Sequence, residues 1–125
     1  MTAPTWIAFL VAAAVGAPSR YVLDAYVQDR TDGVFPWGTL LVNVTGCFAL
    51  GALTGLGLYH HLDPAVRTAV GTGGLGAYTT FSTFTFETVR LAEEGALDEA
   101  VRNTLANVLV GLLAAAGGLW LAAVV

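Results

Sequence analysis

Four apolar stretches, each nearly free of charge, make up most of the chain. A transmembrane helix needs about 20 apolar residues to cross a hydrocarbon core of roughly 30 Å. The stretches run from Pro4 to Tyr26, uncharged until Arg20, from Trp37 to Tyr59, from Thr68 to Phe86, and from Asn103 to Val125. Only 11% of the 125 residues are charged, whereas soluble domains carry about a quarter. The pattern predicts an all-α integral membrane protein with four transmembrane helices.

The predicted helices occupy residues 4–26, 37–59, 64–90 and 100–125 of one transmembrane domain that covers 1–125. Short polar links between the helices hold most of the charges. The first ten residues, MTAPTWIAFL, contain no basic residue. They therefore lack the basic region of a signal peptide, and the first helix is interpreted as retained. We expect a multi-pass protein of the plasma membrane, surrounded by lipid.

The five arginines favour one orientation in the membrane only weakly. Arg30, Arg90 and Arg102 flank the first and third links, while Arg67 adjoins the second. Because cytoplasmic loops are enriched in Lys and Arg, the first and third links have a slight preference for the cytoplasmic side. A bias this weak suits a chain that inserts both ways round.

Four short helices enclose little interior, so two copies would build a polar pathway more easily than one. Gly51 and Gly55 are four residues apart, a spacing of small residues that lets helices approach closely. Gly111, Ala115 and Gly118 lie on one face of the last helix. These small residues indicate close packing, either within one chain or between two.

Polar residues inside the apolar stretches are costly in lipid, so their positions carry information. Thr39 and Asn43 share a helix face, as do Asn103 and Asn107. Carboxamides both donate and accept hydrogen bonds, so these stripes either hold helices together or line a route for a polar solute.

Arg20 and Asp24 of the first predicted helix also allow two interpretations. Arg20 precedes Asp24 by four residues, so the two side chains can pair along the helix. The alternative is that Arg20 attracts anions to a vestibule near one membrane face.

Several function classes lack their usual residues. No Asp or Glu lies near the middle of any apolar stretch, which disfavours our alternative interpretation as a small dual-topology, proton-coupled multidrug or cation antiporter. No arrangement typical of a nucleophile or of a metal bound by side chains is apparent, so an enzyme is not expected. A formal net charge of −4 gives no indication of nucleic-acid binding.

The stretch GTGGLGAYTTFSTFTFE, residues 71–87, predicts a break in the third helix. Glycine weakens a helix by roughly 1 kcal/mol relative to alanine, and four glycines precede Thr79 and Thr80 here. We expect the break between Gly76 and Thr80. Backbone carbonyls freed there are suitable ligands for an alkali cation, and two copies meeting at their breaks could complete its shell.

Two phenylalanines follow the predicted break. Phe81 and Phe84 are three residues apart and share a helix face, with Thr80, Ser82 and Thr83 interleaved. The edge of a phenyl ring is positive, so ring edges and hydroxyl donors together could stabilise a small anion. The alternative is a packed aromatic pair whose neighbouring hydroxyls bond back to helix carbonyls.

The motifs GAPSRY, PWGTLLVNVTGCFALG, GTGGLGAYTTFSTFTFE and NTLANVLVGLLAAAGG occur in this order along the chain. In them the chain resembles the Fluc (CrcB) family of fluoride channels over nearly its whole length. TTFSTF after glycines is the most specific of these motifs. Two residues depart from the family pattern, Ala77 where a second glycine is common and Tyr78 where an aliphatic residue is usual. Tyr78 either adds a hydroxyl near the cation or packs.

The resemblance implies an antiparallel, dual-topology dimer with two fluoride pores and a structural sodium ion at the dimer interface. Backbone carbonyls of Gly76 and Thr79 would hold the sodium. The expected pore residues, including Thr39 from the polar stripe, are Thr39, Asn43, Thr80, Phe81, Ser82, Thr83, Phe84, Asn103 and Asn107. The partner would be an identical copy or an oppositely oriented paralogue. The implied function is passive export of cytoplasmic fluoride, which relieves fluoride toxicity.

Overall fold

A computed structural model describes residues 2–125, in which all regular structure is helical. Helix α1 (Ala3–Gln28) and helix α2 (Trp37–Tyr59) are joined by residues 29–36. Within the described residues three helices are long and apolar enough to cross a membrane: α1, α2 and the continuous helix Leu97–Val124. The last of these consists of α6 (Leu97–Leu105), η2 (Ala106–Val110) and α7 (Gly111–Val124). It begins three residues before the predicted position 100.

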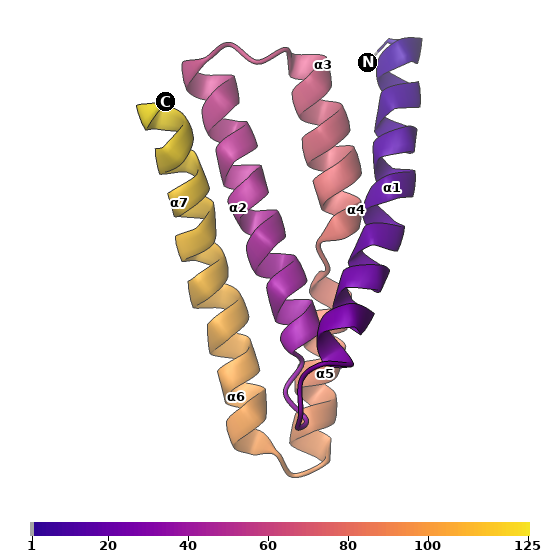
Figure 1. Ribbon diagram of the computed structural model, residues 1–125, viewed down its shortest axis with the longest axis vertical. Helices are drawn as coiled ribbons and strands as arrows, with labels where there is room; N and C mark the ends of the chain where they lie inside the picture. The colour runs from indigo at the N-terminus through magenta and orange to yellow at the C-terminus, as the bar shows by residue number, and fades with distance from the viewer. Residues whose placement is uncertain (1) are drawn as a thin grey trace.

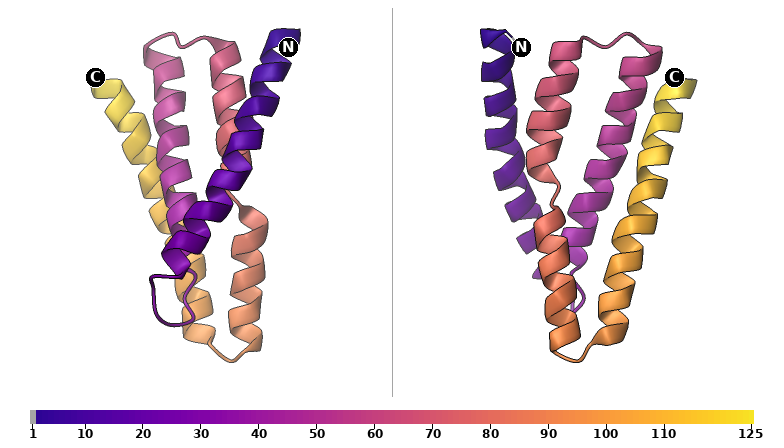
Figure 2. Two further views of the ribbon diagram at one scale, coloured as in Figure 1. Left: turned by 45° about the vertical axis from the view of Figure 1, so that its right-hand side comes forward. Right: turned by 180° about the vertical axis from the view of Figure 1, so that it is seen from behind.

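The third predicted helix is divided into two parts. The first part contains α3 (Pro64–Arg67), the π-helical η1 (Thr68–Leu75) and the short α4 (Gly76–Tyr78). The second is α5 (Phe81–Glu93), 13 residues long and therefore about 20 Å. Neither part alone reaches the roughly 30 Å of a hydrocarbon core. The unwound connection between α4 and α5 is visible in the right-hand view of Figure 2.

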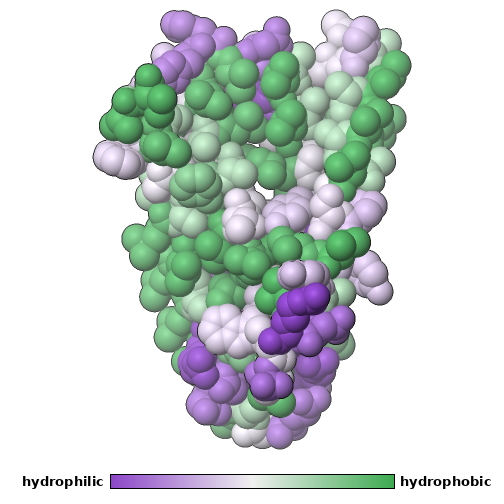
Figure 3. All heavy atoms as spheres, viewed as in Figure 1, coloured by the Kyte–Doolittle hydropathy of each residue, from purple (hydrophilic) through white to green (hydrophobic). Residues whose placement is uncertain are grey.

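The chain runs up and down one long axis (Figure 1). Both termini lie at the same end as the link between α2 and α3, whereas the α1–α2 and α5–α6 links lie at the other end. In Figure 3, hydrophobic residues cover most of the middle and hydrophilic residues gather at the ends. This distribution fits a helical protein in a bilayer, with apolar side chains toward lipid and charges toward water.

The break changes the helix against which the third segment packs. Before it, η1 and α4 lie along α1; after it, α5 packs against α6. Close packing of α1 on η1 depends on glycines, because a Cβ atom at Gly16 would overlap the carbonyl oxygen of Gly74 and one at Gly73 would lie 2.7 Å from that of Phe9. These glycines therefore allow helix contact, and the break itself follows them.

Helices α2 and α7 form the most extensive contact of the fold. A Cβ atom at Gly51 would overlap the backbone of Ala115, and one at Gly118 would overlap that of Phe48. The small residues identified in the sequence are thus used for packing within one chain. The interpretation of these residues as a surface between two copies is wrong for this helix pair.

This close contact predicts that two neighbouring substitutions in α7 differ in their effect on stability. Gly118→Ala should destabilise the protein by about 1–3 kcal/mol, because an extra carbon in a well-packed interface forces the helices apart. Gly117→Ala is the matched control, since its Cβ would come no closer than 4.0 Å to Phe48. Thermal unfolding in detergent measures both. Equal unfolding temperatures for the two variants would contradict this account of the α2–α7 contact.

Candidate functional site

The helix break falls on two residues with extended backbone. Thr79 has φ −76° and ψ 158°, and Thr80 has φ −144° and ψ 121°. The break predicted between Gly76 and Thr80 is therefore confirmed, at its C-terminal limit. Ala77 lies in α4, and the one positive φ among non-glycine residues of 2–125 is at His61. Alanine consequently fits position 77 without the strain that a left-handed conformation would impose.

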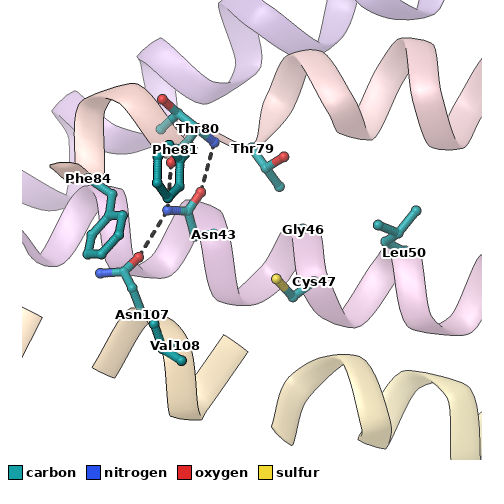
Figure 4. Close-up of a pocket in the computed structure, with 10 residues that line it drawn as sticks. All are labelled: Asn43, Gly46, Cys47, Leu50, Thr79, Thr80, Phe81, Phe84, Asn107 and Val108. Carbon is teal, nitrogen blue, oxygen red and sulfur yellow. Dashed lines mark hydrogen bonds between the residues drawn. The ribbon is translucent and has the colours of Figure 1, made fainter. Parts of the chain in front are cut away.

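Asn43 of α2 supplies the hydrogen bonds that the broken backbone loses. The Thr80 N–H donates to Asn43 Oδ1 at 2.9 Å, and Asn43 Nδ2 donates to the Thr80 carbonyl at 3.0 Å. Figure 4 shows these contacts. Thr80 also caps α5, because its Oγ1 accepts from the Thr83 N–H at 3.1 Å. The side chain predicted to line a pore is thus also the side chain that stabilises the break.

These contacts leave two carbonyls without their usual helical donors. In a continuous helix the Thr80 N–H would donate to Gly76 and the Thr83 N–H to Thr79, but both N–H groups bond to side chains instead. The Thr79 carbonyl accepts from Arg20 Nη1 at a long 3.3 Å. Gly76 and Thr79 are the two residues predicted to hold a cation, and their carbonyl oxygens have the hard donor chemistry that an alkali cation requires.

Arg20 contacts the helix break and makes no ion pair with Asp24. Within the described chain, no ion pair joins Arg20 to Asp24; the salt bridges are Arg90–Glu94 and Arg102–Glu99. Of the two alternatives that the sequence left open for Arg20, the ion pair with Asp24 is therefore not formed. The guanidinium reaches across from α1 to the Thr79 carbonyl, and so brings a positive charge to the break.

Three asparagines form a continuous chain of hydrogen bonds from the break toward α5. Asn43 Nδ2 donates to Asn107 Oδ1 at 2.9 Å, and Asn107 Nδ2 donates to Asn103 Oδ1 at 2.9 Å and to its carbonyl at 3.0 Å. Asn103 Nδ2 donates to Thr88 Oγ1 at 2.9 Å. Asn43 is half-buried and Asn103 fully buried. All three carboxamides therefore direct their N–H groups at protein oxygens.

Thr88 was not predicted from the sequence. Its hydroxyl accepts from Asn103 and donates to the Phe84 carbonyl at 2.8 Å. The available signal was spacing, since Thr80, Phe84 and Thr88 succeed one another at four-residue intervals on one face of α5.

The hydroxyls after the break do not all behave alike. Thr85 and Thr88 bond back to carbonyls of α5, as the packing alternative predicts. Thr80 Oγ1, in contrast, donates to Thr83 Oγ1 at 2.9 Å and lies 3.4 Å from Ser82 Oγ. These three hydroxyls form a small cluster at the start of α5 whose hydrogen bonds run between side chains.

Phe81 and Phe84 stand beside this polar cluster. Their ring centroids are 5.9 Å apart with an interplanar angle of 65°, an edge-on arrangement. Phe84 is half-buried, whereas Phe81 is 77% exposed. Both rings line an open pocket of about 270 Å³ together with Asn43, Thr80 and Asn107 (Figure 4). Two carboxamide side chains, Thr80 and two phenyl rings therefore line one small space.

Thr39 lies apart from this pocket. It is 1% exposed, and its hydroxyl donates to Glu87 Oε1 at 2.9 Å. The second carboxylate oxygen of Glu87 is buried and has no hydrogen-bond partner within residues 2–125. Of the predicted pore residues, the structure brings Asn43, Thr80, Phe81, Phe84 and Asn107 to the pocket, with Asn103 one helical turn further along.

Among the described residues, no three His, Cys, Asp or Glu side chains are grouped so that they could hold a metal ion. A cation at this break would depend on backbone oxygens.

Known proteins match the chain over nearly its whole length. The family model described as CrcB-like protein, Camphor Resistance (CrcB), matches residues 7–119. A protein of Streptomyces avermitilis named fluoride-specific ion channel FluC 1 is 50% identical over 117 residues, 94% of each chain. Fluoride-specific ion channel FluC of Acidobacterium capsulatum is 44% identical and aligns with 96% of this chain and 92% of its own length.

A third relative, fluoride-specific ion channel FluC 1 of Frankia casuarinae, is 46% identical, with 94% of this chain and 95% of the relative aligned. The matched family residues include α2, the break and the asparagine chain. These relatives are named as ion channels and not as enzymes. The chain belongs to the CrcB-like family, which the motifs around the helix break had indicated.

Proposed function

We propose that this chain is a channel of the plasma membrane through which cytoplasmic fluoride leaves passively, relieving fluoride toxicity. The observation that carries the proposal is the pocket at the break, where Asn43, Thr80 and Asn107 lie beside the Phe81 and Phe84 rings. The relatives named fluoride-specific ion channels support the same anion. They give no support to the proton-coupled antiporter, whose mid-membrane carboxylate has no counterpart at this pocket.

The proposed pore uses neutral donors to replace the water around fluoride. A hydrogen bond to an anion is roughly twice as strong as one between neutral groups. Fluoride can therefore displace the bond between Asn43 Nδ2 and Asn107 Oδ1 and take the released N–H as its own donor. Because no fixed positive charge lines the pocket itself, the anion would be held loosely enough to leave, as conduction requires.

The pathway beyond the pocket would follow the remaining polar side chains. Ser82 and Thr83 add hydroxyls at the start of α5, and Asn103 continues the amide chain. Thr39 does not line the pocket, and its hydroxyl bonds to Glu87 of α5. It would therefore lie along the pathway only beyond the pocket.

Four membrane crossings follow if the broken segment serves as the third. Both termini lie at one end of the molecule (Figure 1), so an even number of crossings fits the chain. The parts on either side of the break would each enter the bilayer from an opposite face. Their extended junction would then lie at depth, where non-helical backbone is tolerated only against protein or a polar cavity.

Two antiparallel copies would complete the pore. The Phe81 ring beside the pocket is 77% exposed, and a second copy that covered it would give the pocket another wall. An identical chain in the opposite orientation is the proposed partner, and the weak arginine bias is compatible with both orientations. The alternative partner is an oppositely oriented paralogue. Cross-linking followed by mass measurement would distinguish a pair of identical chains from a pair of different ones.

A sodium ion at the dimer interface is part of the proposal. Gly76 is exposed, and its carbonyl, like that of Thr79, lacks the helical donor that it would have in a continuous helix. Two copies would contribute four such oxygens. These carbonyls would coordinate the sodium and so join the two breaks, while the side chains of each chain would still hold and orient the fluoride.

The first prediction from this proposal concerns Phe81. Liposomes containing the purified protein should release fluoride and retain chloride, as measured with ion-selective electrodes. Phe81→Ala should slow fluoride release by about tenfold, equivalent to the loss of roughly 1.4 kcal/mol of aromatic contact. Phe86→Ala is the matched control, since Phe86 is also an exposed phenylalanine of α5 but does not line the pocket.

Rapid fluoride release by a folded Phe81→Ala protein would contradict the assignment of Phe81 to the pore. Release of chloride as fast as fluoride by the unaltered protein would contradict the proposed selectivity.

The second prediction concerns the cation. Protein purified and reconstituted without sodium, with N-methylglucamine as the replacement, should release fluoride more slowly and dissociate more readily into single chains. Adding sodium back should restore both the rate of fluoride release and the association of the two chains, because the freed carbonyls of the break coordinate it. Fluoride release that is the same in both media would argue against a sodium site at Gly76 and Thr79.

A further inference from the structure

Helix α2 contacts the break at three successive residues of the third segment. Asn43 bonds to the backbone of Thr80, and a Cβ atom at Gly46 would overlap the methyl group of Thr79. The third contact joins Thr45 Oγ1 to the hydroxyl of Tyr78 at 2.8 Å. The proposed function uses Asn43 and Thr80 but not the contact between Thr45 and Tyr78.

The direction of this third hydrogen bond follows from the surroundings of Thr45. Its Oγ1 lies 2.7 Å from the Leu41 carbonyl and 3.1 Å from the Val42 carbonyl. A hydroxyl has one proton to donate, and these two acceptors occupy it. The phenolic O–H of Tyr78 is therefore the donor to Thr45.

Tyr78 is half-buried: α4 lies along α1, and the ring lies beside Gly46 of α2. Within residues 2–125, the bond to Thr45 is the one hydrogen bond that its side chain makes. The helix α4 that carries it has three residues, follows the glycine-rich η1 and leads directly into the extended Thr79. Glycines weaken a helix by roughly 1 kcal/mol each. A phenolic hydroxyl left without a partner in an apolar environment is also costly, so the bond to Thr45 holds the end of α4 against α2.

We infer that Tyr78 is a positioning residue of the conduction site. Its hydroxyl ties the N-terminal side of the break to α2, as Asn43 ties the C-terminal side. Thr79 and Thr80 are thereby held between two fixed points of one helix. This sets the direction of the Thr79 carbonyl and the start of α5, where Phe81 lies. The effect on transport rests on the proposed fluoride channel.

The test is a double-mutant cycle on Tyr78 and Thr45 in the full-length protein. Tyr78→Phe removes only the donor. Thr45→Val keeps the shape but removes the acceptor together with the bond that its hydroxyl makes back to the Leu41 carbonyl. Each should slow fluoride release from liposomes about fivefold, the equivalent of one hydrogen bond of roughly 1 kcal/mol. The double variant should be no slower than either single variant, because all three lack the same bond.

Matched controls separate this bond from the general effect of losing a hydroxyl. Thr54 of α2 is exposed and bonds back to the Leu50 carbonyl at 2.8 Å, as Thr45 does to Leu41, but it has no hydrogen-bonded side-chain partner among the described residues. Thr54→Val and Tyr59→Phe should therefore release fluoride at the unaltered rate. Thr45→Ser, which keeps an acceptor oxygen, should restore release relative to Thr45→Val.

Thermal unfolding of the same variants provides a readout independent of transport. If Tyr78 is a positioning residue, Tyr78→Phe and Thr45→Val should release fluoride more slowly at 25 °C although both proteins remain folded at that temperature. Their shifts in unfolding temperature should not add in the double variant. Unchanged release by folded Tyr78→Phe, or additive losses in the double variant, would overturn the inference while leaving the channel intact. No fluoride release from the unaltered protein would instead contradict the proposed function, and the positioning role with it.

Discussion

Backbone that leaves the helical conformation inside a bilayer has no water to bond with, so its N–H and C=O groups must find partners in the protein. At Thr80 both groups are satisfied by one carboxamide, that of Asn43. An amide can do this because its NH2 group donates while its oxygen accepts; a leucine at this position could do neither. The break, the start of α5 and the orientation of its phenylalanines therefore depend on Asn43.

The same arrangement explains why the proposed pore has donors that are already occupied. Asn43, Asn107 and Asn103 each point their N–H groups at a protein oxygen, so the chain is stable without an anion. An entering fluoride exchanges a bond between neutral groups for a charge-assisted one, and the oxygen it displaces must turn away. This exchange keeps the cost of an empty pore low, since no buried donor is left unsatisfied.

The sequence was most informative where one physical requirement acts on many residues. Bilayer thickness imposes the length of apolar runs, so α1 and α2 were predicted to within two residues at each end. Glycines placed the break in the right segment, although for an incomplete reason: Gly73 and Gly74 allow contact with α1, and the extended residues come later, at Thr79 and Thr80. Glycine permits both close approach and unwinding, and the sequence does not separate the two.

Contacts across helices were harder to predict, because they depend on the rotation of one helix against another. From the sequence, Arg20 could either pair with Asp24 on its own helix or attract anions, yet it reaches the Thr79 carbonyl at the helix break. Tyr78 likewise departs from the expected aliphatic residue, and its role follows only once Thr45 is seen beside it. The hydroxyl that Tyr78 adds, where an aliphatic residue is usual, can be interpreted only once its partner Thr45 is known. In related chains, such partners should be sought on the helix that packs against the broken segment, on either side of the break.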